Sequence, residues 1–173
     1  MIQHTHFKFC PKCGRRGISA ADAKSMHCKS CGYVYFHNCT AAVAGIVETS
    51  KGIILTVRNA NPKKGKTDLP GGFTEYNESM EEALGREIKE ELNIGISRMK
   101  YFGSFPNVYR YENVTYFTID TVFICKPESL STLRMNGEIA AVMYAKPEAI
   151  DFSRIGFPST KRALRKYRAL KIR

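Results

Sequence analysis

The sequence predicts an α/β (α+β) fold, in which a mixed α/β domain follows a small cysteine-rich module. Three observations predict it. Two Cys-x-x-Cys pairs lie within the first 31 of the 173 residues. Several short segments rich in apolar and β-branched residues come after them, and a capped amphipathic helix spans 80–92. A chain of this length is expected to form one core with a small metal-stabilised module beside it.

The first module is defined by the pairs Cys10-Pro-Lys-Cys13 and Cys28-Lys-Ser-Cys31, each followed by glycine. Each pair forms a turn that points two thiolates at one ion, and four thiolates make a closed tetrahedral zinc site. We therefore predict a structural Zn²⁺ and a zinc ribbon over residues 1–39. A redox role for a single pair is the alternative, but two matched pairs favour the metal.

The second domain is placed at 40–173, and its strands follow from short apolar segments. The expected strands are 42–47, 52–57, 101–111, 114–125 and 139–145. The third and fourth are joined at Glu112-Asn113, which indicates a hairpin. Pro147 can open a short helix. The pattern of Ala163, Leu164, Tyr167 and Leu170 predicts an amphipathic helix over 161–173.

The central helix carries an unusual cluster of acidic residues. Seven of the sixteen Asp and Glu residues lie between Glu75 and Glu91, although the formal net charge is +11. Ser79 and Glu82 form a capping box that begins the helix. Carboxylates gathered in this way repel one another unless cations neutralise them, and a divalent metal site is the simplest explanation.

The candidate ligands are three glutamates on one face of this helix. Glu87, Glu90 and Glu91 are spaced i, i+3 and i+4, so they lie about one turn apart. Their hard oxygen atoms suit Mg²⁺ or Mn²⁺ better than zinc. The preceding turn ends in Gly71 and Gly72, where the backbone can approach a ligand and a carbonyl can bind the metal. A merely solvated acidic helix face is the alternative.

The same window resembles the Nudix box, G-x5-E-x7-R-E-U-x-E-E-x-G-U, where U is aliphatic. The matching residues are Gly72, Glu78, Arg86, Glu87, Ile88, Glu90, Glu91 and Ile94. Asn93 replaces the second glycine, and asparagine is the next best residue for a left-handed helix end. The resemblance implies the Nudix fold, an α/β/α sandwich around a mixed sheet.

The resemblance also implies a chemistry. Nudix hydrolases use Mg²⁺ or Mn²⁺ to cleave a nucleoside diphosphate linked to another moiety. It implies that Glu87 and Glu91 bind metal directly. Glu90 is then a ligand of a second metal or a group that orients water, and the Gly71 carbonyl in the Gly71-Gly72 turn is a backbone ligand.

Three further residues take supporting or catalytic roles by the same resemblance. Arg86 and Glu78 are expected to form an ion pair that holds the glutamates, and a purely structural role for this pair is the alternative. Glu138 resembles the downstream metal-binding glutamate of NADH pyrophosphatases, which makes it a candidate catalytic residue. An ordinary loop glutamate is the other reading. The general base is therefore Glu138 or a glutamate of the box.

A zinc ribbon before a Nudix domain resembles the NADH pyrophosphatase group. The Trp-Pro-Phe-Pro core of that group's diagnostic segment is missing from 103–109, so NAD(H) and ADP-ribose-like substrates both stay open. Four aromatic residues are candidates for base stacking or for strand packing: Tyr109, Tyr111, Tyr116 and Phe117.

The partners expected are a small nucleotide, RNA as a possibility, and a second copy in a homodimer. A nucleic-acid-binding ribbon protein or a decapping-type RNA-processing Nudix protein is the alternative function. The segment 161–173 has seven basic residues and no acid, which is compatible with RNA or with a solvated helix face. Zinc-type cysteine usage, with no signal peptide and no long apolar run, predicts a cytoplasmic protein and no membrane contact.

Overall fold

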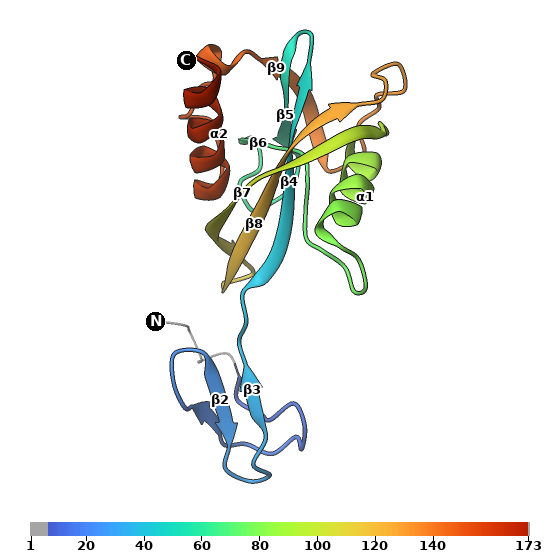
Figure 1. Cartoon of the computed structure of the whole chain (residues 1–173). Helices are drawn as coiled ribbons and strands as arrows, with labels where there is room; N and C mark the ends of the chain where they lie inside the picture. Colours follow the sequence, from blue (N-terminus) through green and yellow to red (C-terminus); the bar gives the residue numbers. More distant parts are fainter. Residues whose placement is uncertain (1–6, 173) are drawn as a thin grey trace.

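The computed structural model describes residues 7–172 (Figure 1). His4 and His6, for which the sequence favours a surface position over zinc binding, lie outside the described residues, as does Arg173. In chain order the elements are β1 (Ile18–Ala20), β2 (Ser25–Cys28), β3 (Val34–Phe36), β4 (Thr40–Thr49), β5 (Gly52–Arg58), β6 (Thr67–Asp68), α1 (Met80–Leu92), β7 (Ile96–Tyr111), β8 (Val114–Pro127), β9 (Ile139–Ala145), the 3-10 helix η2 (Pro147–Ala149) and α2 (Pro158–Lys171).

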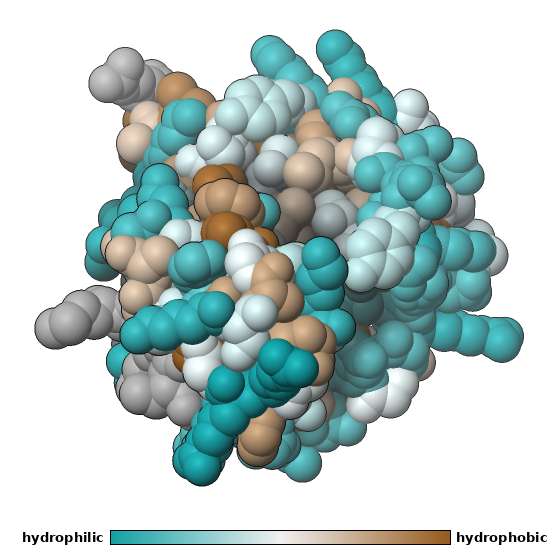
Figure 2. Space-filling model, turned by 90° about the horizontal axis from the view of Figure 1, so that it is seen from below, coloured by the Kyte–Doolittle hydropathy of each residue, from teal (hydrophilic) through white to brown (hydrophobic). Residues whose placement is uncertain are grey.

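The first three strands form a small antiparallel sheet in the order β1-β2-β3. From residue 7 onward, four residues make up its buried hydrophobic core: Cys10, Ile18, Met26 and Cys28. The view from below shows apolar residues on the surface among hydrophilic ones (Figure 2), and Phe9 and Phe36 are exposed. So small a core cannot stabilise a fold by burial alone, which is why this unit needs its cysteines.

The remaining strands form a mixed six-stranded sheet. Its order is β6-β5-β4-β8-β7, and β9 pairs with β5. β4 and β8 are parallel, whereas β7 and β8 form the predicted antiparallel hairpin. Glu112 and Asn113 at its tip have φ angles of 48° and 63°, which match a two-residue turn with both residues left-handed. Residues 37–39 join the two sheets; the domain boundary after residue 39 stays a prediction.

One helix covers each face of the large sheet (Figure 1). On β5, Ile54 belongs to the core beneath α1, whereas Ile53 and Leu55 belong to the core beneath α2. A strand that is buried on both faces reads as a continuous apolar run, which is why the sequence shows one here. The predicted α/β/α sandwich with a mixed sheet is confirmed.

Helix α1 begins and ends where its sequence predicts. The Ser79 hydroxyl accepts a hydrogen bond from the Glu82 N–H at 3.2 Å, and the Glu82 carboxylate accepts one from the Ser79 N–H at 2.8 Å. Leu84, Ile88 and Leu92 are fully buried, as their spacing indicates. The acidic face of the helix is therefore turned away from the core of the sheet.

Asn93 closes α1 in the left-handed conformation, with φ 54° and ψ 33°. Its side-chain Nδ2 donates to the Thr132 carbonyl at 2.9 Å, and the Thr132 hydroxyl donates to the Asn93 carbonyl at 2.9 Å. The asparagine that replaces the box glycine thus does two things. It adopts the required backbone conformation, and it fixes the loop before β9 to the end of the helix.

Substituting Asn93 with alanine is expected to lower the free energy of unfolding by about 2 kcal/mol. About half comes from left-handed strain and about half from the lost hydrogen bond. Asn93→Gly removes the strain and is expected to cost about 1 kcal/mol. Urea denaturation measures both. Equal losses for the alanine and glycine variants would show that the backbone conformation is not the cause.

Helix α2 begins three residues before the predicted start, because Pro158 occupies its first turn and proline is favoured there. Ala163, Leu164 and Tyr167 are buried as expected. The prediction that Leu170 belongs to the buried face is wrong, since its side chain is 56% exposed. It lies in the last turn, past Tyr167, the final α2 residue in the core.

Several basic side chains of α2 contact other residues of the same domain. Lys166 lies 4.6 Å from the centre of the Phe102 ring and donates to the Phe102 carbonyl at 2.9 Å. Lys171 forms a 2.8 Å ion pair with Glu48. These contacts favour the interpretation that the basic helix packs on the domain over the interpretation that it binds RNA. Neither helix of the described range 7–172 is both long and apolar enough to cross a membrane.

Candidate active site and zinc centre

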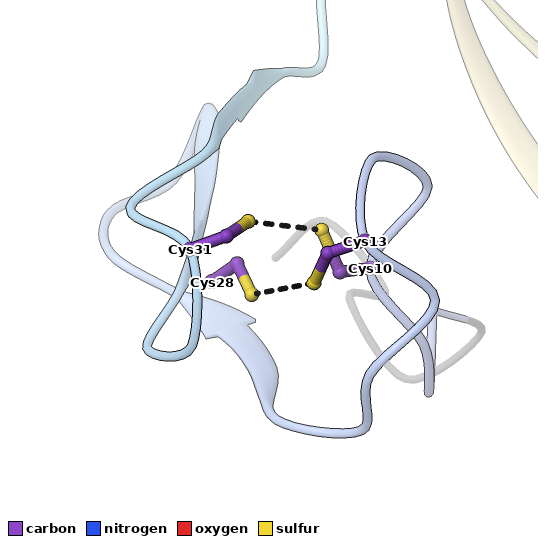
Figure 3. A group of neighbouring side chains, drawn as sticks. All are labelled: Cys10, Cys13, Cys28 and Cys31. Carbon is purple, nitrogen blue, oxygen red and sulfur yellow. Dashed lines mark hydrogen bonds between the residues drawn. The ribbon is translucent and has the colours of Figure 1, made fainter.

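The four predicted zinc ligands lie together in the ribbon (Figure 3). The sulfur atoms of Cys10 and Cys31 are 3.8 Å apart, as are those of Cys13 and Cys28, and all four lie within 4.8 Å of one another. A tetrahedral zinc with bonds of about 2.3 Å separates its sulfurs by about 3.8 Å. The cluster therefore fits zinc. Among residues 7–172 it is the only group of three or more potential ligands this close together.

The two cysteine turns have the same backbone geometry. The N–H groups of Gly14 and Gly32 donate to the carbonyl of the first cysteine of their pair, at 2.9 and 3.0 Å. Their φ angles are 70° and 72°, which explains why glycine follows each pair. Burial alone raises the pKa of the Cys28 thiol, but the N–H groups of Cys31 and Ser30 outweigh it and lower that pKa to about 6. A thiolate is the form that binds metal.

The glycine turn before α1 leaves no room for side chains. Gly71 has a φ of 142°, and a Cβ there would overlap the carbonyl oxygen of Val43. A Cβ on Gly72 would overlap the carboxylate of Glu87. The two glycines therefore let the turn lie directly between β4 and the acidic face of α1.

Hydrogen bonds fix this turn and orient its middle carbonyl. The N–H groups of Val43 and Gly45 on β4 donate to the carbonyls of Gly72 and Pro70, both at 2.9 Å. The Gly71 carbonyl accepts no hydrogen bond within the described part of the chain. It is thus available as the backbone ligand that the resemblance implies.

Glu91 is the most buried carboxylate of the helix, with 7% of its surface exposed. One oxygen accepts a hydrogen bond from the Gly71 N–H at 3.1 Å. Burial raises the pKa of its carboxyl to about 8, and repulsion from Glu87 and Asp68 adds to the shift. Burial also raises the pKa of Glu87. One buried and one partly buried carboxylate a helical turn apart indicate a place where a cation would be stabilised.

Arg86 joins three glutamates of the box. Its Nε and Nη2 atoms bind both oxygens of Glu78 at 3.0 and 2.7 Å. Its Nη1 atom lies 3.0 Å from Glu87 and 3.2 Å from Glu90. Nη2 also donates to the Phe73 carbonyl at 3.0 Å. The guanidinium therefore fixes both the loop before α1 and the position of the Glu87 carboxylate.

A cavity of about 350 Å³ opens beside the glycine turn, and it receives the distal glutamate as well. Glu87, Glu91 and Glu138 all line it. The loop that carries Glu138 is fixed, because the backbone and side chain of Asn59 donate to the carbonyls of Glu138 and Gly137 at 2.8 Å. The structure thus brings together glutamates 51 positions apart in sequence.

Glu90 is placed differently from the other predicted ligands. Its side chain is 56% exposed, it contacts Arg86, and it is not among the residues that line the cavity. Glu78 also lies outside the lining and acts through Arg86. The predicted set therefore divides into three glutamates in the cavity and two at its edge.

The sequence did not predict a polar floor between the sheet and the first turn of α2. The Asp120 carboxylate accepts hydrogen bonds from the hydroxyls of Thr118 and Ser159, the first at 2.6 Å. The Asp68 carboxylate accepts one from Thr160 at 2.7 Å. Asp120 is the only acidic residue in β8, and this was the signal in the sequence that could have indicated a buried polar site.

Aromatic rings line the cavity beside this floor. Tyr109 stacks on Phe157 with ring centres 5.7 Å apart, and Phe73 meets Tyr109 edge-on at 5.3 Å. The Arg58 guanidinium lies 5.2 Å from the centre of the Phe157 ring. Of the predicted stacking candidates, Tyr109 lines this cavity, whereas Tyr111 and Tyr116 line an adjoining apolar hollow with Phe73 and Tyr109.

The donor set of the cavity fits a hard divalent cation. Carboxylate oxygens and a backbone carbonyl are what Mg²⁺ and Mn²⁺ prefer. No three carboxylates within residues 7–172 converge as closely as the four thiols do. Mg²⁺ does not require three converging carboxylates, because it keeps several waters and is usually bound by one or two carboxylates together with substrate phosphates.

Comparison with known proteins identifies the family. Residues 39–167 match the family model described as NUDIX domain, which is most of the chain. This chain belongs to the Nudix family. The Nudix chain is 32% identical over 125 residues to the NAD-capped RNA hydrolase NudC of Haemophilus influenzae (strain PittGG), covering 69% of this chain and 47% of that protein.

A second relative with the same name shows a similar degree of sequence identity. The Nudix chain is 31% identical over 109 residues to the NAD-capped RNA hydrolase NudC of Vibrio atlanticus (strain LGP32), covering 61% of this chain and 40% of that protein. The matches thus extend over less than half the length of these relatives.

Solved structures support the fold. A NUDIX hydrolase from Nitrosomonas europaea superposes with a TM-score of 0.72 at 24% identity, covering 94% of this chain and 91% of its own. A MutT NUDIX hydrolase from Burkholderia pseudomallei superposes with a TM-score of 0.64 at 20% identity, covering 74% of this chain and 97% of its own.

Proposed function

We propose that this Nudix protein is a pyrophosphohydrolase that requires Mg²⁺ or Mn²⁺ and cleaves a nucleoside diphosphate linked to another moiety. The observation that carries the proposal is the cavity that Glu87, Glu91 and Glu138 line together with the Gly71-Gly72 turn. Burial raises the pKa of both helix glutamates, so the site is ready to be neutralised by a cation.

We assign the following roles to the residues of the cavity and its surroundings. Glu87, Glu91 and the Gly71 carbonyl hold the metal, and Glu90 assists a second ion or orients water. The metal supplies neutralisation of the pyrophosphate and activation of water for attack on phosphorus. Arg86, held by Glu78, keeps Glu87 in position. Glu138 is the proposed base that accepts the proton of the attacking water, and cleavage leaves two phosphate monoesters.

We propose NAD(H) or an ADP-ribose-like compound as the substrate. The names of both relatives refer to NAD-capped RNA, so a dinucleotide at the end of an RNA is the second candidate. One feature of this chain favours a longer substrate. A hollow of about 690 Å³, whose charged lining residues are Lys63, Arg110 and Glu112, shares Phe157 with the catalytic cavity. Two cations there would attract further phosphates.

The deciding experiment is a substrate panel with Mg²⁺ or Mn²⁺, made up of NADH, NAD, ADP-ribose, diadenosine polyphosphates, FAD, nucleoside triphosphates and NAD-capped RNA. We expect hydrolysis of at least one nucleoside diphosphate derivative. We further expect activity to fall at least about 100-fold when the divalent ion is chelated and to return when Mg²⁺ is added back. Product chromatography measures both.

Zinc content is followed in parallel, so that loss of the ribbon metal is not mistaken for loss of the catalytic ion. Hydrolysis that is unaffected by chelation would contradict the metal requirement. If purified protein turns over no member of the panel, the enzyme proposal fails, and a binding role for the ribbon protein takes its place. Free thiols and the zinc cluster support our proposal that the protein works in the reducing cytoplasm.

A further inference from the structure

The side-chain oxygen of Asn107 has no hydrogen-bond partner among residues 7–172. Asn107 lies on β7, is 7% exposed, and lines the same cavity as Glu87 and Glu91. Its Oδ1 atom is the only buried side-chain nitrogen or oxygen without a hydrogen bond in the part of the chain that the structure describes. Such atoms are rare in folded proteins because an unpaired buried carbonyl is costly. A ligand that donates a hydrogen bond to Oδ1 would remove this free-energy cost.

The three hydroxyls of the polar floor do not supply this donor, because their protons are directed at carboxylates. The hydroxyls of Thr118 and Ser159 donate to Asp120, and the hydroxyl of Thr160 donates to Asp68. Each hydroxyl has only one proton to donate. Thr118 lies directly opposite Asn107 in the sheet, so even the nearest hydroxyl is turned to a carboxylate instead.

The surroundings indicate which chemical group fits. Tyr109 lies two positions from Asn107 on the same strand, so both side chains project from the same face of the sheet. Its ring, the Phe157 ring stacked on it and the Phe73 ring at its side form an aromatic wall of the same cavity. A planar ring bearing an N–H₂ group would stack on the aromatic wall and donate to Oδ1.

We propose that Asn107 determines specificity by accepting a hydrogen bond from an –NH₂ group that a planar ring of the substrate carries, either directly or as part of a carboxamide. This rests on the proposed hydrolase function and adds the part of the substrate that is recognised. Two sources carry such a group in the expected substrates: the 6-amino group of adenine and the carboxamide of nicotinamide. A ring in which oxygen or a methyl group replaces the –NH₂ would leave Oδ1 unpaired.

The test compares kcat/KM for three dinucleotides with the same pyrophosphate. They are NAD, nicotinamide hypoxanthine dinucleotide, which lacks the adenine amino group, and 3-acetylpyridine adenine dinucleotide, which lacks the carboxamide amino group. We expect one analogue to react about 10- to 100-fold more slowly than NAD, and that analogue identifies the ring. ADP-ribose and its hypoxanthine counterpart repeat the adenine comparison.

Asn107→Leu keeps the size of the side chain and removes the acceptor. It is expected to lower kcat/KM for NAD by a similar factor and to bring NAD and the slow analogue within about twofold of each other. Its melting temperature without substrate is expected to equal or exceed that of the wild type, because no atom is left unpaired. Ser104→Ala, at an exposed position on the same strand, is the matched control and should change none of these values.

The proposal is overturned if the wild-type protein hydrolyses NAD and both analogues within about threefold of one another, a comparison that needs no variant. It is also overturned if Asn107→Leu keeps the full discrimination. A lower melting temperature with unchanged discrimination would assign Asn107 a purely structural role. Failure of the hydrolase function itself looks different, because no substrate would then be turned over.

Discussion

Glu91→Gln is expected to reduce kcat by about 1,000-fold or more while the protein stays folded. Glutamine has the same shape and keeps an oxygen for the Gly71 N–H, but it removes one negative charge from the proposed metal site. A loss of about 4 kcal/mol in transition-state stabilisation corresponds to this factor. Burial disfavours the ionised form of Glu91, so the variant should be at least as stable as the wild type.

The comparison needs both activity and stability. Turnover of the best substrate of the panel gives kcat, and thermal denaturation without metal gives the melting temperature. Glu81→Gln is the matched control, since Glu81 lies exposed in the first turn of the same helix and should retain full activity. If Glu91→Gln keeps more than a tenth of the wild-type kcat, Glu91 is not a ligand of the catalytic ion.

Cys28→Ser is expected to empty the zinc site and unfold the ribbon. Zinc binding to a four-cysteine site contributes about 10–16 kcal/mol, far more than the small ribbon core can replace. Zinc content should fall from about one ion per chain to nearly none. Limited proteolysis should then cut the segment before β4, whereas the wild-type ribbon resists.

Cys39→Ser is the appropriate comparison, because Cys39 is exposed and lies outside the cluster. It should leave both the zinc content and the protease resistance unchanged. A Cys28→Ser protein that still holds one zinc would mean that the remaining thiols, or a group outside the cluster, complete the site.

The parts of this molecule that could be predicted from sequence are those with local determinants. The capping box of α1 involves Ser79 and Glu82, three positions apart, and the hairpin tip is two residues long. The cysteine turns are equally local. The ribbon strands escaped prediction for a different reason: each has only three or four residues, which is too short to show an apolar period.

The floor of the cavity could not be predicted because it is assembled from distant segments. Asp68, Asp120 and Ser159 come from β6, β8 and α2, and only the sheet order brings them together. The significance of Asn107 also depends on the fold, since a sequence does not show which amide lacks a partner. Glu138 could be proposed only through the family resemblance, and its loop proves to lie at the same cavity.

The contacts of Arg86 have a consequence for how substitutions combine. One guanidinium binds Glu78, Glu87 and Glu90, so removing any of these carboxylates releases hydrogen-bond donors that the other two can share. The energetic effects of substitutions at these positions should therefore not add, since each pair is coupled through a common partner.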